Sequence, residues 1–323
     1  MQAGALDGVD PDQRGEWSAH QALLYGSEEE FLAGTVPFIQ DGLECGDPIR
    51  IATTDRSTAW LRAALGVDSQ HVTFCESRQW YGHPVRALAA LHRTVQAAAQ
   101  AGQRLRMIGE PLWTARTAPE SKEWARHESL VNAAFAVADA ALLCTYDIRV
   151  VDADAVANVG RTHPKLVVNG SLRPSPNYTD PAAFNAECNR PPLPELPPPA
   201  LWLRFHRLEQ LATLRDFVTA HALQAGAAAH IVEQFVHAVD EVATNAIEHG
   251  GESGVLQIWI DRHTMLCEVS DTGAGLRDPL VGHLPPGVAG RRHGLWLARQ
   301  FSDLVELHSD AAGTTVRLHL ALP

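Results

Sequence analysis

The chain has 323 residues and a mass of 35.1 kDa, about twice the length of one average domain, so two domains are expected. Its formal net charge of −12 disfavours a nucleic-acid binder, because such proteins carry basic surfaces. The apolar share of 46% is ordinary for a folded protein and too high for global disorder.

No segment of the sequence has the pattern of a signal peptide or a membrane span. The first residues carry acidic side chains and no apolar run, and the most apolar stretch, 133–144, is short and interrupted by Asp139. The five cysteines are scattered and never spaced as Cys-x-x-Cys, so we expect reduced cysteines, mostly in the core. These features predict a cytoplasmic protein that does not enter a membrane.

The first half of the chain alternates helical and strand-like segments. The apolar spacing predicts helices over 28–43, 85–101 and 123–139, and strands over 48–53, 104–108 and 140–146. Such alternation predicts an α/β domain with a mostly parallel sheet.

Six prolines in the twelve residues 189–200 predict an extended interdomain spacer. We therefore divide the chain into a domain over 1–188, a linker over 189–200 and a domain over 201–323. Acidic residues outnumber basic ones on both sides of the spacer, which disfavours a nucleic-acid module in either half.

The second half begins with a predicted strand over 201–205 and helices over 208–222 and 230–248. From Gly254 the apolar period becomes two, with Leu256, Ile258 and Ile260 expected on one face of a strand. Helices packed on an antiparallel sheet, an α+β two-layer sandwich, are the expected architecture.

The predicted helix 230–248 carries a polar pair opposite its apolar stripe. Glu241 and Asn245 are four residues apart, so their side chains can reach one site. Taken alone, this spacing favours a solvated helix face.

Three glycine-containing motifs follow in order. Asp271-x-Gly273-x-Gly275 places an acid at a strand end before flexible backbone, and taken alone it is equally consistent with a tight turn. Gly294-Leu295 opens a helix after a Gly- and Pro-rich segment, 276–293, that suits a mobile lid, and Gly313-Thr314 enters the last strand. Four elements in this order within 120 residues are more specific than any one of them.

This order of motifs resembles the Bergerat ATP-binding fold of gyrase, Hsp90 and histidine kinases, and most closely the anti-sigma factor serine kinases of the RsbW family. The resemblance implies the cofactors ATP and Mg²⁺. It places Asn245 at the metal, Asp271 at the adenine amino group and Thr314 at the water molecules around the adenine. It further implies that Glu241 is the general base. The glycines and the phosphate-loop residues that it assigns to the nucleotide pocket are Gly273, Gly275, Arg292, Gly294 and Leu295.

Two alternatives stay open. The family often has glycine where this chain has Arg292, which is compatible with a non-catalytic partner switch. A histidine kinase is disfavoured, because the prolines occupy the place of its dimerising hairpin. A Walker-type lysine cradle is excluded, since no lysine follows residue 200.

Six short motifs mark the first half of the chain: His20 with Leu24-Tyr25, Phe38-Ile-Gln-Asp-Gly42-Leu, Gly109-Glu110 with Trp113, Trp124 with Glu128 and Asn132, Cys144-Thr-Tyr-Asp147, and His163-Pro164. By these motifs, residues 15–185 resemble the MEDS sensory domain of bacterial regulators, which is similar to a RecA-like fold without its ATP loop. The resemblance implies a small organic signal. The residues that could line a sensory pocket or a metal site are His20, Glu110, Trp113, Trp124, Glu128, Cys144 and His163. For each of them alone, a satisfied core or surface position is the simpler interpretation.

The combined resemblance implies a stress-response transcription regulator. Its C-terminal module would bind a sigma factor and phosphorylate a Ser or Thr of a STAS-domain anti-sigma antagonist, under control of the front domain. Relatives often pair, so a homodimer is compatible with the resemblance.

Overall fold

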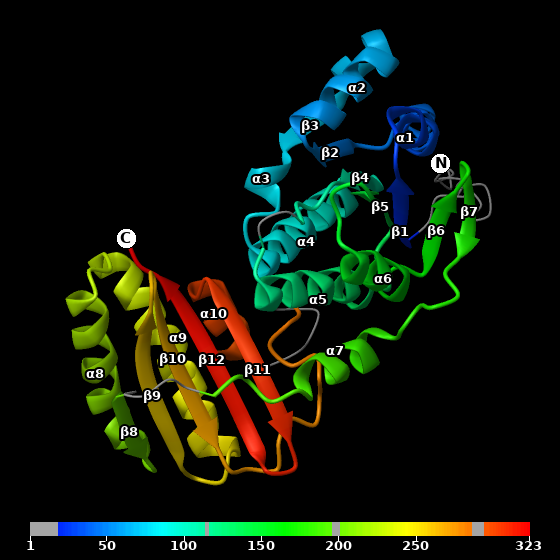
Figure 1. Ribbon diagram of the computed structural model, residues 1–323. Helices are drawn as coiled ribbons and strands as arrows, with labels where there is room; N and C mark the ends of the chain where they lie inside the picture. The colour runs from blue at the N-terminus through cyan, green and yellow to red at the C-terminus, as the bar shows by residue number, and fades with distance from the viewer. Residues whose placement is uncertain (1–18, 114–115, 196–200, 286–293) are drawn as a thin grey trace, which may run out of the picture. The chain divides into compact units, whose positions relative to one another are not determined.

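The computed structural model describes residues 19–113, 116–195, 201–285 and 294–323 (Figure 1). The chain forms two compact units. The first comprises Met1–Gly82, Leu91–Thr114 and Phe135–Tyr178, and the second comprises His83–Ala90, Ala115–Ala134 and Thr179–Pro323. None of the described helices is long and apolar enough to cross a membrane.

The first unit is built on a seven-stranded sheet in the order β3-β2-β4-β5-β1-β6-β7, in which only the β6–β7 pair is antiparallel. The strands are β1 (Ala19–Tyr25), β2 (Ile49–Thr53), β3 (Val72–Glu76), β4 (Leu105–Gly109), β5 (Ala140–Asp147), β6 (Lys165–Val168) and β7 (Ser171–Pro174). This confirms the predicted α/β class with a mostly parallel sheet.

Helices cover both faces of this sheet. They are α1 (Glu28–Cys45), α2 (Asp55–Leu65), the 3-10 turn η2 (Gly66–His71), α3 (Ser77–Trp80), α4 (Pro84–Gln100), whose first turns belong to the second unit, and α6 (Ala153–Thr162). Side chains of α1 and α2 pack on Leu23 and Leu143, while Val159 of α6 packs on Ala22 and Cys144, because successive residues of a strand point to opposite faces.

Local chemistry sets the ends of α1. The Ser27 side chain accepts a hydrogen bond from the Glu30 backbone at 3.2 Å, and glutamates occupy the first turn, where the helix dipole favours negative charge. The helix ends at Gly46, whose φ of 70° is left-handed. These caps bring the chain back into the sheet at β2.

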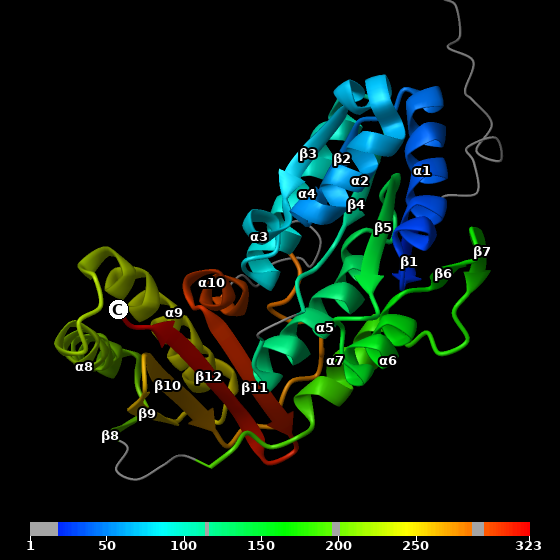
Figure 2. The same ribbon diagram turned by 45° about the horizontal axis from the view of Figure 1, so that its top comes forward.

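The second unit is a two-layer sandwich on a sheet ordered β11-β12-β10-β9-β8, with every pair antiparallel (Figure 2). Its strands are β8 (Leu201–Phe205), β9 (Gly254–Asp261), β10 (Thr264–Asp271), β11 (Leu304–Asp310) and β12 (Gly313–Ala321). Its helical elements are α5 (Ala118–Ala134), α7 (Pro181–Asn189), η3 (Leu208–Gln210), α8 (Leu211–Gln224), α9 (Ala229–His249) and α10 (Gly294–Phe301). The predicted α+β sandwich is confirmed.

The core of this unit lies between the sheet and helices α8, α9 and α10. Phe235, Val239 and Ala243 of α9 are fully buried against Leu256 and Leu318 of the sheet. Burial of this apolar stripe fixes which side of α9 faces away from the core, and that side carries Glu241 and Asn245.

Two details differ from the sequence expectation. Ile260 is 54% exposed, although it alternates with the buried Leu256 and Ile258. The five cysteines are free, but only Cys144 and Cys267 are buried.

Candidate functional site

A cavity of about 810 Å³ opens beside α9 in the second unit. Its walls come from α9, the ends of β10 and β12, the segment after β10 and the start of α10. The residues along it are Val242, Asn245, Ala246, Glu248, His249, Gly250, Val269, Asp271, Ala274, Gly275, Leu276, Arg277, Asp278, Val281, Gly282, Gly294, Leu295, Thr314 and Val316. This volume lies in the range of small-molecule and cofactor sites.

Asp271 is the anchored acid of this cavity. Its Oδ1 accepts hydrogen bonds from the backbone N–H of Gly273 at 2.9 Å and of Thr314 at 3.2 Å. Burial raises the pKa of Asp271 above its ordinary value, and these two N–H groups lower it in part. Since Oδ1 is engaged, Oδ2 remains as the acceptor that a ligand can use.

Glycines allow the backbone to approach this acid. A Cβ on Gly250 would collide with the Asp271 carboxylate, and a Cβ on Gly273 would lie 2.7 Å from the Gly250 Cα. Gly275 has a left-handed φ of 73°, and a Cβ there would collide with the Asp310 carbonyl. The Asp-x-Gly-x-Gly turn therefore requires glycine at both positions for steric reasons.

The polar pair of α9 meets the start of α10. A Cβ on Gly294 would lie 2.5 Å from Oε2 of Glu241 and 3.3 Å from Nδ2 of Asn245. Asn245 lines the cavity, whereas Glu241 lies beside it, half-buried, with His237 Nε2 at 3.8 Å from its Oε1. The absence of a side chain at Gly294 leaves room for both polar groups.

The cavity brings together most of the residues that the sequence assigned to it. Those along its walls are Asn245, Asp271, Gly275, Gly294, Leu295 and Thr314. Gly273 lies in the Asp271 turn and packs against Gly250. Glu241 lies next to the cavity, and Arg292 lies outside the described residues. Sequence reasoning missed Gly282, whose left-handed φ of 72° brings it against Leu295, although its glycine-rich segment was a signal.

A buried charge cluster lies at the far end of α10. Arg299 donates to Glu123 of α5 at 3.0 Å, to the Val305 carbonyl at 3.2 Å and toward His283 Nε2 at 3.1 Å. The second guanidinium, that of Arg126, lies 2.9 Å from Glu123 and 3.2 Å from His283 Nε2. Burial, followed by the two arginines, holds the pKa of His283 well below its usual value, so this imidazole is neutral.

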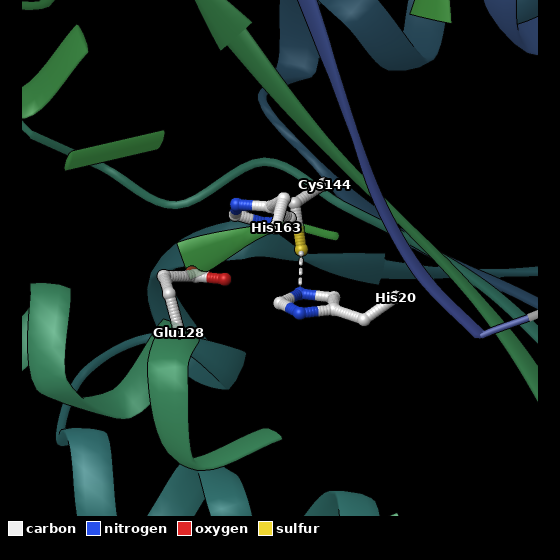
Figure 3. A group of neighbouring side chains, drawn as sticks. All are labelled: His20, Glu128, Cys144 and His163. Carbon is white, nitrogen blue, oxygen red and sulfur yellow. Dashed lines mark hydrogen bonds between the residues drawn. The ribbon is translucent and has the colours of Figure 1, made fainter. Parts of the chain in front are cut away.

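The candidate sensory residues of the sequence fall into separate places. His20, Cys144 and His163 converge on one face of the parallel sheet (Figure 3), whereas Glu128 belongs to helix α5 of the second unit. Glu110 lies elsewhere: it accepts hydrogen bonds from the Tyr25 hydroxyl at 2.7 Å and the Thr54 N–H at 2.8 Å. Glu110 therefore ties β4 to the start of α2.

The two tryptophans have other neighbours. The Trp113 ring lies 6.1 Å from the Tyr146 ring, in the first unit. The Trp124 ring lies under the Arg116 guanidinium at 4.1 Å and beside His127 at 5.0 Å, in the second unit.

The second unit has the architecture of a histidine kinase-like ATPase domain, with a helix and an acid-glycine turn on either side of the cavity. Residues 206–320 match the family profile of the histidine kinase-like ATPase domain, HATPase_c_2. Residues 19–164 match the profile of MEDS, the methanogen/methylotroph DcmR sensory domain. The chain thus joins a MEDS domain to a histidine kinase-like ATPase domain, as the sequence resemblance predicted. No curated protein was found to match it.

Proposed function

We propose that this chain is an ATP-dependent protein serine/threonine kinase that works as an anti-sigma regulator. In this proposal it phosphorylates a STAS-domain antagonist, sequesters a sigma factor and is tuned by a small signal at the MEDS domain. The match to a histidine kinase-like ATPase domain supports the ATP-binding part of this role. The observation that carries the proposal is Asp271, which lines a cavity of nucleotide size and whose Oδ1 is held by two backbone N–H groups.

The residues along the cavity fit ATP and Mg²⁺. Oδ2 of Asp271 would accept from the purine amino group, and the Asn245 amide oxygen would hold the metal near the phosphates. Mg²⁺ prefers a few oxygen ligands and, when bound, neutralises phosphate charge. A Cβ at Gly294 would fill the space next to Asn245, so the chain itself keeps that corner open.

Glu241 is the proposed general base of the transfer. Its Oε2 lies at the Gly294 corner, one helical turn from Asn245. There it would take the proton from the substrate hydroxyl as that oxygen bonds to the γ-phosphorus and the bond to the β,γ-bridging oxygen breaks. ADP leaves with the electrons of the broken bond, and the acceptor becomes a phosphoserine or phosphothreonine.

A transfer assay with γ-labelled Mg-ATP and purified STAS-domain proteins tests the kinase. We expect Glu241→Gln to lower the transfer rate by about 10²–10⁴-fold, the usual contribution of a general base, with ATP affinity nearly unchanged. The matched control is Glu233→Gln, which changes an exposed glutamate on the same helix. Undiminished transfer in Glu241→Gln would remove Glu241 from its role, and absence of ATP binding would remove the kinase.

One observation favours a second candidate, a non-catalytic partner switch. Glu241 does not line the cavity and stands 3.8 Å from His237 at the helix surface. Calorimetric titration of ATP with and without the partner separates the two functions. The switch predicts a partner complex with an affinity independent of ATP and no labelled product, whereas the kinase predicts both binding and label transfer.

A further inference from the structure

Three side chains of the first unit gather on one face of its sheet. His20 comes from β1, Cys144 from the neighbouring β5, and His163 follows the end of α6. Nε2 of His20 lies 3.2 Å from Sγ of Cys144, and the two imidazole rings lie 4.0 Å apart between centroids. In the parallel register Ala22 faces Cys144, so His20, two residues earlier, projects from the same face.

The neighbours of His163 determine which ring nitrogen carries its proton. Nδ1 lies 3.0 Å from the Val159 carbonyl oxygen, which can only accept a hydrogen bond, so Nδ1 carries the hydrogen. Nε2 is therefore the ring nitrogen that carries a lone pair, and the Tyr146 hydroxyl lies 3.4 Å from it. A histidine that ligates a metal is oriented in this way, since its second nitrogen donates to a backbone carbonyl.

The spacing of these atoms suits a tetrahedral metal. Zinc binds sulfur at about 2.3 Å and imidazole nitrogen at about 2.0–2.1 Å, which gives a nitrogen–sulfur separation of about 3.6 Å at the tetrahedral angle. The separation of 3.2 Å between His20 and Cys144 is close to that value. With exposures of 3% for His20, 8% for Cys144 and 0% for His163, all three donors are shielded from water.

We propose that His20, Cys144 and His163 bind a zinc ion. One thiolate and two neutral imidazoles are ligands that zinc takes, while magnesium and calcium prefer oxygen. One ligand atom from each of these three residues lies within 4.8 Å of the others (Figure 3). The Cys144 thiolate would offset part of the charge of the ion, which lowers the cost of burying it.

Metal titration of the full chain, stripped with a chelator, tests the site. With Co²⁺ as probe, we expect one equivalent per chain and a thiolate-to-cobalt charge-transfer band, which Zn²⁺ then displaces. Cys144→Ser should abolish the band and weaken Zn²⁺ binding by more than about 100-fold. Losing a residue that only supports a metal ligand costs up to about 100-fold in affinity, and losing the ligand itself should cost more. The matched control is Cys75→Ser, on β3 of the same unit, which should leave band and affinity unchanged.

Three results would overturn the assignment: less than one tight equivalent of metal, a cobalt spectrum without the thiolate band, or a band that survives Cys144→Ser. If Cys144→Ser does not fold, the band of the unmutated chain and its loss in His20→Gln carry the same test. None of these measurements uses ATP, so the zinc site stands or falls independently of the proposed kinase.

Discussion

Replacing Glu123 by alanine should destabilise the second unit by about 3–5 kcal/mol. Glu123 is the carboxylate that both buried guanidinium groups share, with side-chain exposures of 6% for Glu123, 2% for Arg299 and 1% for Arg126. Removing one partner of a buried ion pair leaves an uncompensated charge that water cannot reach, and this costs about 3–5 kcal/mol of folding free energy in other proteins. His283 cannot compensate, because its neutral ring only accepts from the two arginines.

The measurement is the free energy of unfolding from a urea titration followed by circular dichroism. The transition of the second unit is identified by its shift to higher urea with Mg-ATP, since a ligand stabilises only the unit that binds it. The control is Asp240→Ala, which breaks a surface ion pair in which Arg215 is 45% and Asp240 22% exposed. Losing this pair should cost at most about 1 kcal/mol. If Glu123→Ala cost no more than this control, the reasoning about the buried cluster would be refuted.

Further predictions concern the cavity and the first unit. Asp271→Asn should weaken ATP binding by about 10–100-fold in calorimetry, because a donor would then face the purine amino group at a cost of about 1–3 kcal/mol. Gly294→Ala should slow phosphate transfer more than it weakens ATP binding, since its Cβ displaces the Glu241 carboxylate; equal losses would contradict this. The hydrogen bond from Arg149 lowers the pKa of Asp147 in the folded protein. The Asp147 carboxylate therefore stabilises the fold above its unfolded-state pKa, and this stabilisation is lost as pH falls through its folded-state pKa. Urea titrations should accordingly show that Asp147→Asn destabilises at neutral pH and has little effect in acid.

The α9 prediction succeeded because its determinants are local. The apolar residues of α9 recur at the helical period, so the spacing alone identified the buried stripe and placed Glu241 and Asn245 on the other side. The Asp271 turn was equally visible, since acid and glycines are adjacent in sequence. What the sequence could not give is the position of Glu241 beside the cavity, which depends on the approach of α10.

The start of α5 shows a local signal that was missed. The prediction began this helix at residue 123, whereas α5 is Ala118–Ala134. Thr117 and Glu120 form a capping box: the Glu120 carboxylate accepts from the Thr117 N–H at 2.7 Å, and the Thr117 hydroxyl accepts from the Glu120 N–H at 3.4 Å. The Thr-x-x-Glu spacing was available in the sequence and carries more information about the boundary than the apolar period.

Non-local groups could not be predicted as groups. Glu123 and Arg299 are 176 positions apart, and Cys144 is 124 positions from His20. The chemistry of each residue suggested a candidate, but only the strand order of the sheet brings Cys144 beside His20 while leaving Glu110 at the start of α2. Sequence reasoning therefore named a set of seven sensory residues, of which a smaller group shares one place.

Helix α10 connects the cavity to the buried charges. Gly294 begins the helix at the cavity and Arg299 follows five residues later, about 7.5 Å along the axis. A short helix moves as one rigid body. A shift of α10 at Arg299 therefore also shifts Gly294 at the cavity. We therefore expect Glu123→Ala to weaken ATP binding as well as to destabilise the unit, with the ATP affinity measured by calorimetry in the absence of urea. A variant that is less stable but binds ATP with unchanged affinity would show that α10 holds its cavity end without Glu123.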